Sequence, residues 1–192
     1  SGVVFPLQCG YSCSHTRTWK AEAMTTAKKS PFPKAADTLE PCALAEGLFT
    51  ARLANGLRVI IREDHRTAVA ICNVWVKVGS NREPEPMRGW SHGIEHMLFK
   101  GTEKRPPGAI ANQVQKLGGY INAYTSFDRT VYWIDIPSNG APEAVEILAD
   151  VMQNATLPED EYVKEQEVIR REFAMGFDDP GRQSSELMLR TV

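Results

Sequence analysis

Residues 91–102 contain the side chains best suited to chemistry, in the order His92-x-x-Glu95-His96. On an α-helix successive residues turn by about 100°, so the two His residues and the Glu would share one face. Two imidazoles at positions i and i+4 can bind one Zn²⁺ ion. A neighbouring carboxylate can act as a general base toward the water that attacks a substrate. The spacing therefore predicts a hydrolytic zinc site.

A pattern of five residues also arises by chance on surface helices, but other features of the chain support a metal site. Only four His occur in the 192 residues, and two of them stand in this motif. The opposite face of the helix would carry Ile94, Met97 and Leu98, which we expect to pack into a core. The helix itself is predicted from about residue 87 to residue 99.

A catalytic zinc ion usually has three protein ligands and one water molecule, so a further carboxylate is needed. The predicted helix after Pro158 offers Glu165 and Glu172, which share an i, i+3, i+4, i+7 stripe with the apolar Val168 and Ile169. A carboxylate on a buried stripe is costly unless it is paired or binds a metal. The two acids are about 10 Å apart along the helix axis, so only one can be a direct ligand. The other would orient a His residue, and periodicity leaves the choice open.

Composition limits the class of protein. The chain is 42% hydrophobic and 24% charged, with a net charge of −2, which suits one globular domain. This charge does not favour nucleic acid or an anionic membrane as a partner. No stretch approaches the ~18 apolar residues of a membrane span, and no convincing signal peptide is present. We therefore expect a soluble protein of the cytoplasm.

Residues 1–47 show no regular period and are rich in Ser, Thr, Pro and Lys, so we predict a poorly ordered leader. Met24 resembles a translation start better than Ser1 does, which makes residues 1–23 candidate upstream sequence. Basic residues outnumber acids at this end of the chain. No amphipathic, Arg-rich helix accompanies them, so we do not predict a mitochondrial transit peptide.

The four Cys residues do not suggest a disulfide scaffold. Cys9, Cys13 and His15 could form half of a metal site, but no fourth ligand lies nearby in the sequence. Cys72 lies inside a strand pattern and is expected to be a buried thiol.

From residue 48 the chain alternates strand and helix patterns. The predicted strands cover residues 49–53, 57–62, 68–78, 120–127 and 129–137, and the predicted helices cover 87–99, 109–117, part of 138–153, 159–177 and a stretch from 180. Asn55-Gly56 is a strong hairpin signal, and Thr156 with Glu159 has the spacing of a capping box. Hairpin connections predict a largely antiparallel sheet with helices on one face, which is an α+β fold. The core side of the third strand would carry Ala70, Cys72, Val74, Val76 and Val78.

Four segments in this order resemble the pitrilysin family of inverted-motif zinc peptidases, which includes insulin-degrading enzyme and the mitochondrial processing peptidase. They are residues 78–83, 92–102, 118–126 and 165–172. The resemblance implies that residues 48–192 are an N-terminal zinc metallopeptidase domain, incomplete at its C-terminal end. Gly93 departs from the family, in which a bulkier apolar residue is usual, and this changes the shape of the pocket.

The resemblance implies a role for each candidate residue. The family's third ligand lies about 76 positions after the second His, so His92, His96 and Glu172 would bind Zn²⁺. Glu95 would be the catalytic base, and Glu165 would support the site from beside the ligands.

The resemblance also implies how a substrate binds. An extended peptide would add as a strand beside Ile121, Asn122 and Ala123, with side-chain pockets giving specificity. We therefore expect a zinc-dependent metalloendopeptidase that hydrolyses oligopeptides or unfolded segments. A homologous C-terminal domain or partner subunit would complete it.

Two alternatives remain. The chain could be a non-catalytic partner subunit of the same fold, although such subunits typically lack an intact metal motif. The zinc site could instead be purely structural, although Glu95, which is not needed as a ligand, argues against that.

Overall fold

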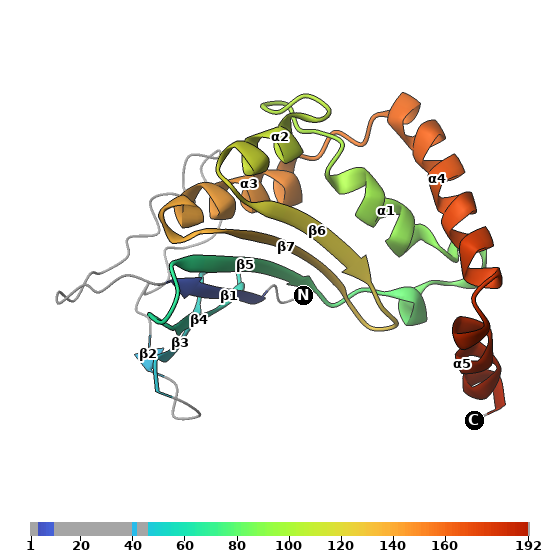
Figure 1. Cartoon of the computed structure of the whole chain (residues 1–192), viewed down its shortest axis with the longest axis horizontal. Helices are drawn as coiled ribbons and strands as arrows, with labels where there is room; N and C mark the ends of the chain where they lie inside the picture. The colour runs from blue at the N-terminus through green and yellow to red at the C-terminus, as the bar shows by residue number, and fades with distance from the viewer. Residues whose placement is uncertain (1–3, 10–39, 42–45, 192) are drawn as a thin grey trace.

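The computed structural model describes residues 4–9, 40–41 and 46–191 of the chain. One sheet carries helices on one face (Figure 1). The sheet order is β2-β3-β4-β1-β5-β7-β6, and its neighbouring strands are antiparallel except for β1 with β4. The predicted α+β class and largely antiparallel sheet are confirmed.

The strands are β1 (Val4–Cys9), β2 (Glu40–Pro41), β3 (Leu48–Arg52), β4 (Arg58–Glu63), β5 (Val69–Val76), β6 (Tyr120–Thr125) and β7 (Thr130–Pro137). The helices are α1 (Trp90–Leu98), α2 (Ala109–Lys116), α3 (Ala141–Asn154), α4 (Glu159–Phe177) and α5 (Pro180–Thr191). Each strand and helix predicted after residue 47 is present, and their ends differ by a few residues at most. Within the described ranges, no helix is both long and apolar enough to cross a lipid bilayer.

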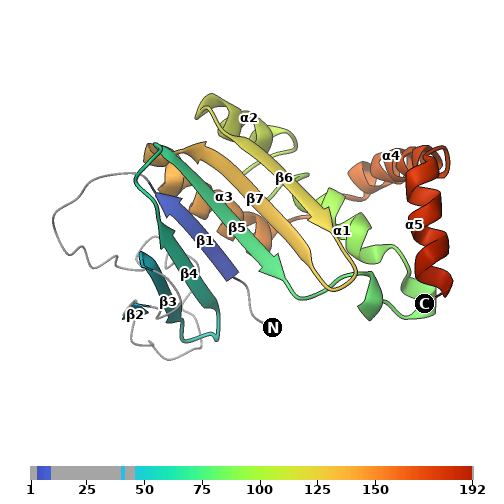
Figure 2. The same cartoon turned by 60° about the horizontal axis from the view of Figure 1, so that its bottom comes forward.

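The stretch predicted as leader contains two strands that the sequence did not indicate. β1 lies between β4 and β5 and pairs with both, in parallel with β4 (Figure 2). The partners of β1 lie more than 50 positions away along the chain, so no local signal such as a hairpin turn indicates this pairing. Residues 10–39, which include Cys13 and His15, lie outside the described part of the chain.

The core lies between the sheet and its helices. On β5 the buried residues are Ala70, Cys72 and Val74, which lie opposite buried residues of β7 in the register Cys72↔Ile134. Helix α3 adds four side chains with no exposed surface, namely Ala144, Ile147, Leu148 and Val151. The predicted core face of β5 is thus confirmed over most of its length. Val78 is an exception, because it lies beyond the strand end and is 45% exposed.

A buried ionic network fixes the loop between α1 and α2. Arg105 donates from Nη1 to Asp150 Oδ2 and from Nε to Gln113 Oε1 at 3.0 Å. Thr102 Oγ1 also donates to Asp150 Oδ2, at 2.7 Å. Burial alone would raise the pKa of Asp150, but hydrogen bonds from Thr102, Asn154 and Arg105 outweigh it and hold that pKa below its usual range. The loop after the motif helix is therefore bound to α2 and α3.

We expect Arg105→Met to lower the free energy of unfolding by roughly 3–5 kcal/mol, because it leaves the Asp150 carboxylate buried without its cation. The lowered pKa of Asp150 means that this stabilisation is present above the unfolded carboxyl pKa of about 3.9 and is lost as pH falls through the folded value. The difference in free energy of unfolding between the wild type and Arg105→Met, measured by urea unfolding, should therefore be smaller at pH 3 than at pH 7.

The matched control is Arg171→Met, which removes an exposed ion pair with Glu167 and should cost at most about 1 kcal/mol. Equal effects of the two substitutions at pH 7 would contradict a structural role for Arg105.

The connection from β5 to α1 passes under the β6–β7 hairpin at Gly79. A Cβ atom at this position would lie 2.2 Å from the carbonyl oxygen of Ser126, so only glycine fits. Next to it, Ser80 N donates to Ser126 O at 3.2 Å and Asn81 N to Phe127 O at 2.8 Å. This close approach brings the end of β6 beside α1.

Helix α4 begins at Glu159, two residues later than a capping box of Thr156 and Glu159 would start it, and the predicted capping box is absent. Pro158 occupies the N-cap position and makes no side-chain cap bond. Thr156 instead donates from both N and Oγ1 to the carbonyl oxygen of Gly101, at 3.1 and 3.3 Å. The threonine hydroxyl is thus used to attach the start of α4 to the loop that follows α1.

Candidate metal centre

Helix α1 carries the motif residues, and a carboxylate from outside the helix holds its first turn. Glu83 Oε2 accepts from Gly89 N at 2.6 Å and Glu83 Oε1 accepts from Ser91 N at 2.7 Å. Burial raises the pKa of Glu83, but these hydrogen bonds outweigh burial and the pKa is lowered. An anion at this end also interacts favourably with the positive end of the helix dipole. The N-terminus of the motif helix is therefore fixed just before His92.

The far side of α1 is only partly buried. Met97 is 3% and Leu98 is 9% exposed, which confirms that they pack into the core. Ile94 is 44% exposed, so its predicted burial is wrong. It lies one turn from Trp90, which is 57% exposed, so this side of α1 faces solvent.

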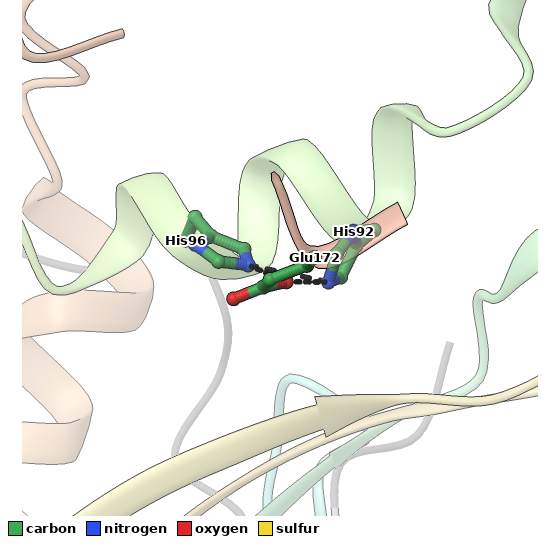
Figure 3. A group of neighbouring side chains, drawn as sticks. All are labelled: His92, His96 and Glu172. Carbon is green, nitrogen blue, oxygen red and sulfur yellow. Dashed lines mark hydrogen bonds and ion pairs between the residues drawn. The ribbon is translucent and has the colours of Figure 1, made fainter. Parts of the chain in front are cut away.

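Two imidazole nitrogens and one carboxylate oxygen converge between α1 and α4 (Figure 3). His92 Nε2 lies 3.2 Å from His96 Nε2. Glu172 Oε2 lies 3.5 Å from the first and 3.4 Å from the second. A tetrahedral zinc ion with bonds of about 2.0–2.1 Å has ligand atoms about 3.3–3.4 Å apart. The three separations fit that geometry, and nitrogen with carboxylate oxygen is a donor set that zinc accepts.

Glu165 lies on the other side of His96. Its Oε2 atom is 2.9 Å from His96 Nδ1, and its Oε1 atom accepts from Lys100 Nζ. The residue is only 8% exposed. Burial raises the pKa of Glu165, but the hydrogen bonds from Lys100 and His96 outweigh burial and the pKa is lowered. Glu165 is thus a buried, ionised acceptor that orients one imidazole.

The predicted stripe on α4 is only partly buried. Glu165 is buried and Ile169 is half-buried, but Val168 is 40% exposed and Glu172 is exposed. The physical reason is that α4 packs against α1 rather than lying over the sheet. The two acids therefore reach the same imidazole from different sides.

Glu95 contacts the edge strand. Thr125 Oγ1, at the end of β6, donates to Glu95 Oε2 at 2.5 Å. The same hydroxyl lies 3.3 Å from Thr130 Oγ1, which itself donates to Val78 O at 2.9 Å. A carboxylate held in this way keeps its other oxygen available. The arrangement suits a base that is positioned by the strand beside it.

The predicted substrate strand is β6, at the edge of the sheet. Asn122 is exposed, while Ile121 and Ala123 are half-buried. Ser126 N donates to Arg129 O at 2.8 Å, and from this bond the alternation of an antiparallel pair directs the N–H of Ala123 to the open edge. That N–H donates to Asn122 Oδ1 at 2.8 Å. The edge therefore has a backbone donor whose present partner is a side chain.

Within the described residues, His92, His96 and Glu172 are the group of three whose ligand atoms all lie within 4.8 Å of one another. A family model described as Insulinase (Peptidase family M16) matches residues 58–190, which is more than half of the chain. The chain belongs to the insulinase family, peptidase family M16. The family expected from the sequence is thereby confirmed.

Relatives of this M16 chain include subunits of larger assemblies. The β subunit of the mitochondrial-processing peptidase of Bos taurus is 45% identical over 121 residues, covering 63% of this chain and 24% of that protein. Cytochrome b-c1 complex subunit 1 of Bos taurus is 38% identical over 123 residues, covering 64% and 25%. The chain thus spans about a quarter of the length of these relatives. The names of both proteins refer to mitochondria. The cytoplasmic location expected for this chain therefore stays a prediction.

Two solved structures share the fold. Pitrilysin matches with a TM-score of 0.64 and 26% identity over 76% of this chain and 16% of that one. A protease from Helicobacter pylori matches with a TM-score of 0.61 and 35% identity over 64% of this chain and 30% of that one.

Three residues that contact the site or its helix were not predicted from the sequence, namely Glu83, Lys100 and Thr125. Glu83 and Thr125 lie inside the segments that carried the resemblance, but no local period connects them to α1. Lys100 stands four positions after His96, which is the one local signal that could have suggested a shared helix face.

Proposed function

We propose that this chain carries the metal ligands and the base of a zinc-dependent endopeptidase that acts on oligopeptides or unfolded segments. The supporting observation is the meeting of His92, His96 and Glu172 at separations that suit tetrahedral zinc, with Glu95 on the same helix. Membership of a peptidase family supports proteolysis as the kind of reaction.

In this proposal each side chain has a separate task. Zinc bound there would lower the pKa of a water molecule and polarise the carbonyl group of the scissile bond. Glu95 receives a proton from the attacking water and passes it to the leaving amine. Glu165 holds the ring of His96, and Thr125 holds Glu95.

The substrate would bind as an added strand along β6, with its backbone next to Ile121, Asn122 and Ala123. The Ala123 N–H at the open edge would exchange its bond to Asn122 for one to a peptide carbonyl. This mode selects extended or unfolded segments, because a folded substrate has its own backbone bonds already paired.

A non-catalytic subunit of the same fold is the second candidate, and cytochrome b-c1 complex subunit 1 as a relative is the observation that favours it. The presence of a complete ligand set together with Glu95 favours the catalytic proposal. A partner with a homologous domain, either later in the same polypeptide or on another subunit, is part of both proposals.

The test uses the assembled protein, meaning this chain with the rest of its polypeptide or its partner subunit. Zinc content and hydrolysis of an unstructured peptide are measured before and after chelation. One equivalent of zinc and chelator-sensitive turnover support the endopeptidase. Zinc without turnover favours a structural site. The absence of both zinc and turnover favours the non-catalytic subunit.

We expect the isolated 192-residue chain to bind zinc but to hydrolyse peptide poorly. A hydrolytic site needs donors for the developing oxyanion, and the loss of one such donor costs about 10²–10³ in rate. In this proposal those donors come from a later domain or from a partner subunit. Leu187 and Met188 on α5 are 64% and 61% exposed, which favours self-association of the isolated chain.

This expectation is checked by assaying the zinc-loaded chain with and without the remainder of the assembly added in trans. Strong chelator-sensitive turnover by the isolated chain would show that the missing donors lie within residues 1–192.

We expect Thr125→Val in the assembled protein to lower kcat by roughly 10–100-fold while zinc content and KM stay close to wild type, because the loss of one hydrogen bond to a charged group costs about 1.5–3 kcal/mol. Thr125→Ser should recover most of the rate. Thr156→Val, which removes a hydroxyl bonded to Gly101, is the control. Unchanged kcat in Thr125→Val would remove Thr125 from the positioning of Glu95.

A further inference from the structure

Lys100 lies two residues beyond the end of α1 and makes its ion pair with the buried Glu165 of α4. The two oxygens of Glu165 have separate partners, with Lys100 Nζ on Oε1 and His96 Nδ1 on Oε2. The Glu165 carboxylate thus connects the Lys100 ammonium group to the His96 ring, whose other nitrogen faces Glu172. Lys100 and His96 are four residues apart, so the same stretch of chain supplies both partners.

The identity of these partners determines which nitrogen of His96 has the proton. An ionised carboxylate can only accept hydrogen bonds, so Nδ1 is the donor in the 2.9 Å contact with Glu165. The lone pair of a neutral His96 is then on Nε2, the atom that lies 3.4 Å from Glu172 Oε2 and 3.2 Å from His92 Nε2.

The two histidines differ in this respect. No residue in the described part of the chain hydrogen-bonds His92 Nδ1, and the ring of His92 meets Phe173 edge-on with 6.0 Å between centroids. His96 is therefore the ligand whose ring is fixed by hydrogen bonding. The His96 ring stays fixed only while the Glu165 carboxylate does. That carboxylate could rotate about the last torsion of its side chain if Oε1 had no partner.

We propose that Lys100 is a positioning residue of the metal centre, which clamps Glu165 and through it holds His96 as an Nε2 donor. This rests on the proposed zinc site. A simple tie between α1 and α4 is the competing explanation, and it predicts a loss of stability without any effect that passes through Glu165.

The charge of Lys100 allows the experiment to distinguish a clamp on Glu165 from a purely electrostatic effect on the metal. A cation close to a site for Zn²⁺ repels the metal, so removing it would by Coulomb's law strengthen binding. Loss of the clamp would weaken binding, because losing an outer partner of a ligand typically costs about 10–100-fold in metal affinity. The two effects have opposite signs.

The experiment measures zinc affinity of the 192-residue chain by competition with a chelator. Lys100→Met, which keeps the stem and removes the charge, should bind zinc about tenfold more weakly, and Lys100→Arg should recover most of that loss. In the Glu165→Gln background, Lys100→Met should cause no further loss of zinc affinity, because Lys100 then has no carboxylate to clamp and the loss of its charge alone favours binding. Lys164→Met, which breaks the exposed pair with Glu161, is the control.

A second readout does not need the metal. The ¹⁵N shifts of the metal-free chain should show His96 protonated on Nδ1 in the wild type and as a mixture of tautomers in Lys100→Met. If the wild type binds no zinc, the proposed function fails while this readout still decides the role of Lys100. Tighter or unchanged zinc binding, an equal loss in both backgrounds, or an unchanged tautomer would overturn the inference.

Discussion

Replacing Glu95 with Gln should abolish most peptide hydrolysis in the assembled protein and leave zinc in place. Glu95 is not one of the three converging ligand residues, so the metal should remain. Gln has nearly the same shape, and its carbonyl oxygen can still accept from Thr125 Oγ1. What it cannot do is take a proton, and the loss of a general base typically costs about 10²–10⁴-fold in rate.

The measurement pairs zinc content with kcat on an unstructured peptide. Glu167→Gln is the matched control, because Glu167 lies on the exposed side of α4 and pairs with Arg171. The control should keep both zinc and rate. Near-wild-type turnover by Glu95→Gln would exclude Glu95 as the base, and loss of zinc would make it a ligand instead.

Glu172→Gln should remove most zinc binding, and its effect should exceed that of Glu165→Gln. An amide is a weaker ligand than a carboxylate, and Glu172 Oε2 lies within 3.5 Å of both imidazole Nε2 atoms. Among the three converging residues, Glu165 contacts only His96, at the nitrogen that faces away from Glu172, so its loss should cost about 10–100-fold.

Metal titration of the two variants, with a chelator as competitor, decides between them. Circular dichroism on the metal-free proteins tests whether both retain their fold. A variant Glu165→Gln that loses zinc while Glu172→Gln keeps it would reverse the assignment.

Local periodicity accounts for what the sequence predicted well. The i and i+4 spacing of His92 and His96 requires only that residues 90–98 be helical, and the alternation of Ala70, Cys72 and Val74 requires only a strand. Both conditions hold. The same reasoning located α4 and its two acids, since their seven-residue spacing does not depend on the partner of the helix.

Contacts between distant elements account for what the sequence did not predict. The choice between Glu165 and Glu172 depends on how α4 crosses α1, and the burial of Ile94 depends on which elements pack against that side of α1. β1 has its partners in β4 and β5, far along the chain. Thr156 could have capped α4, but the loop at Gly101 competes for its hydroxyl. No window of sequence contains both members of these pairs.

The hydrogen bond between the Ala123 N–H and the Asn122 side chain affects how readily the open edge of β6 pairs with another chain. An open sheet edge is a template on which other chains can pair and aggregate. Here the outward N–H of Ala123 already donates to Asn122 Oδ1, so an added strand exchanges that bond instead of gaining a new one. The net contribution of a typical hydrogen bond is only about 0.5–1.5 kcal/mol, and an exchange yields less. A chance partner therefore gains little at this one position of the edge.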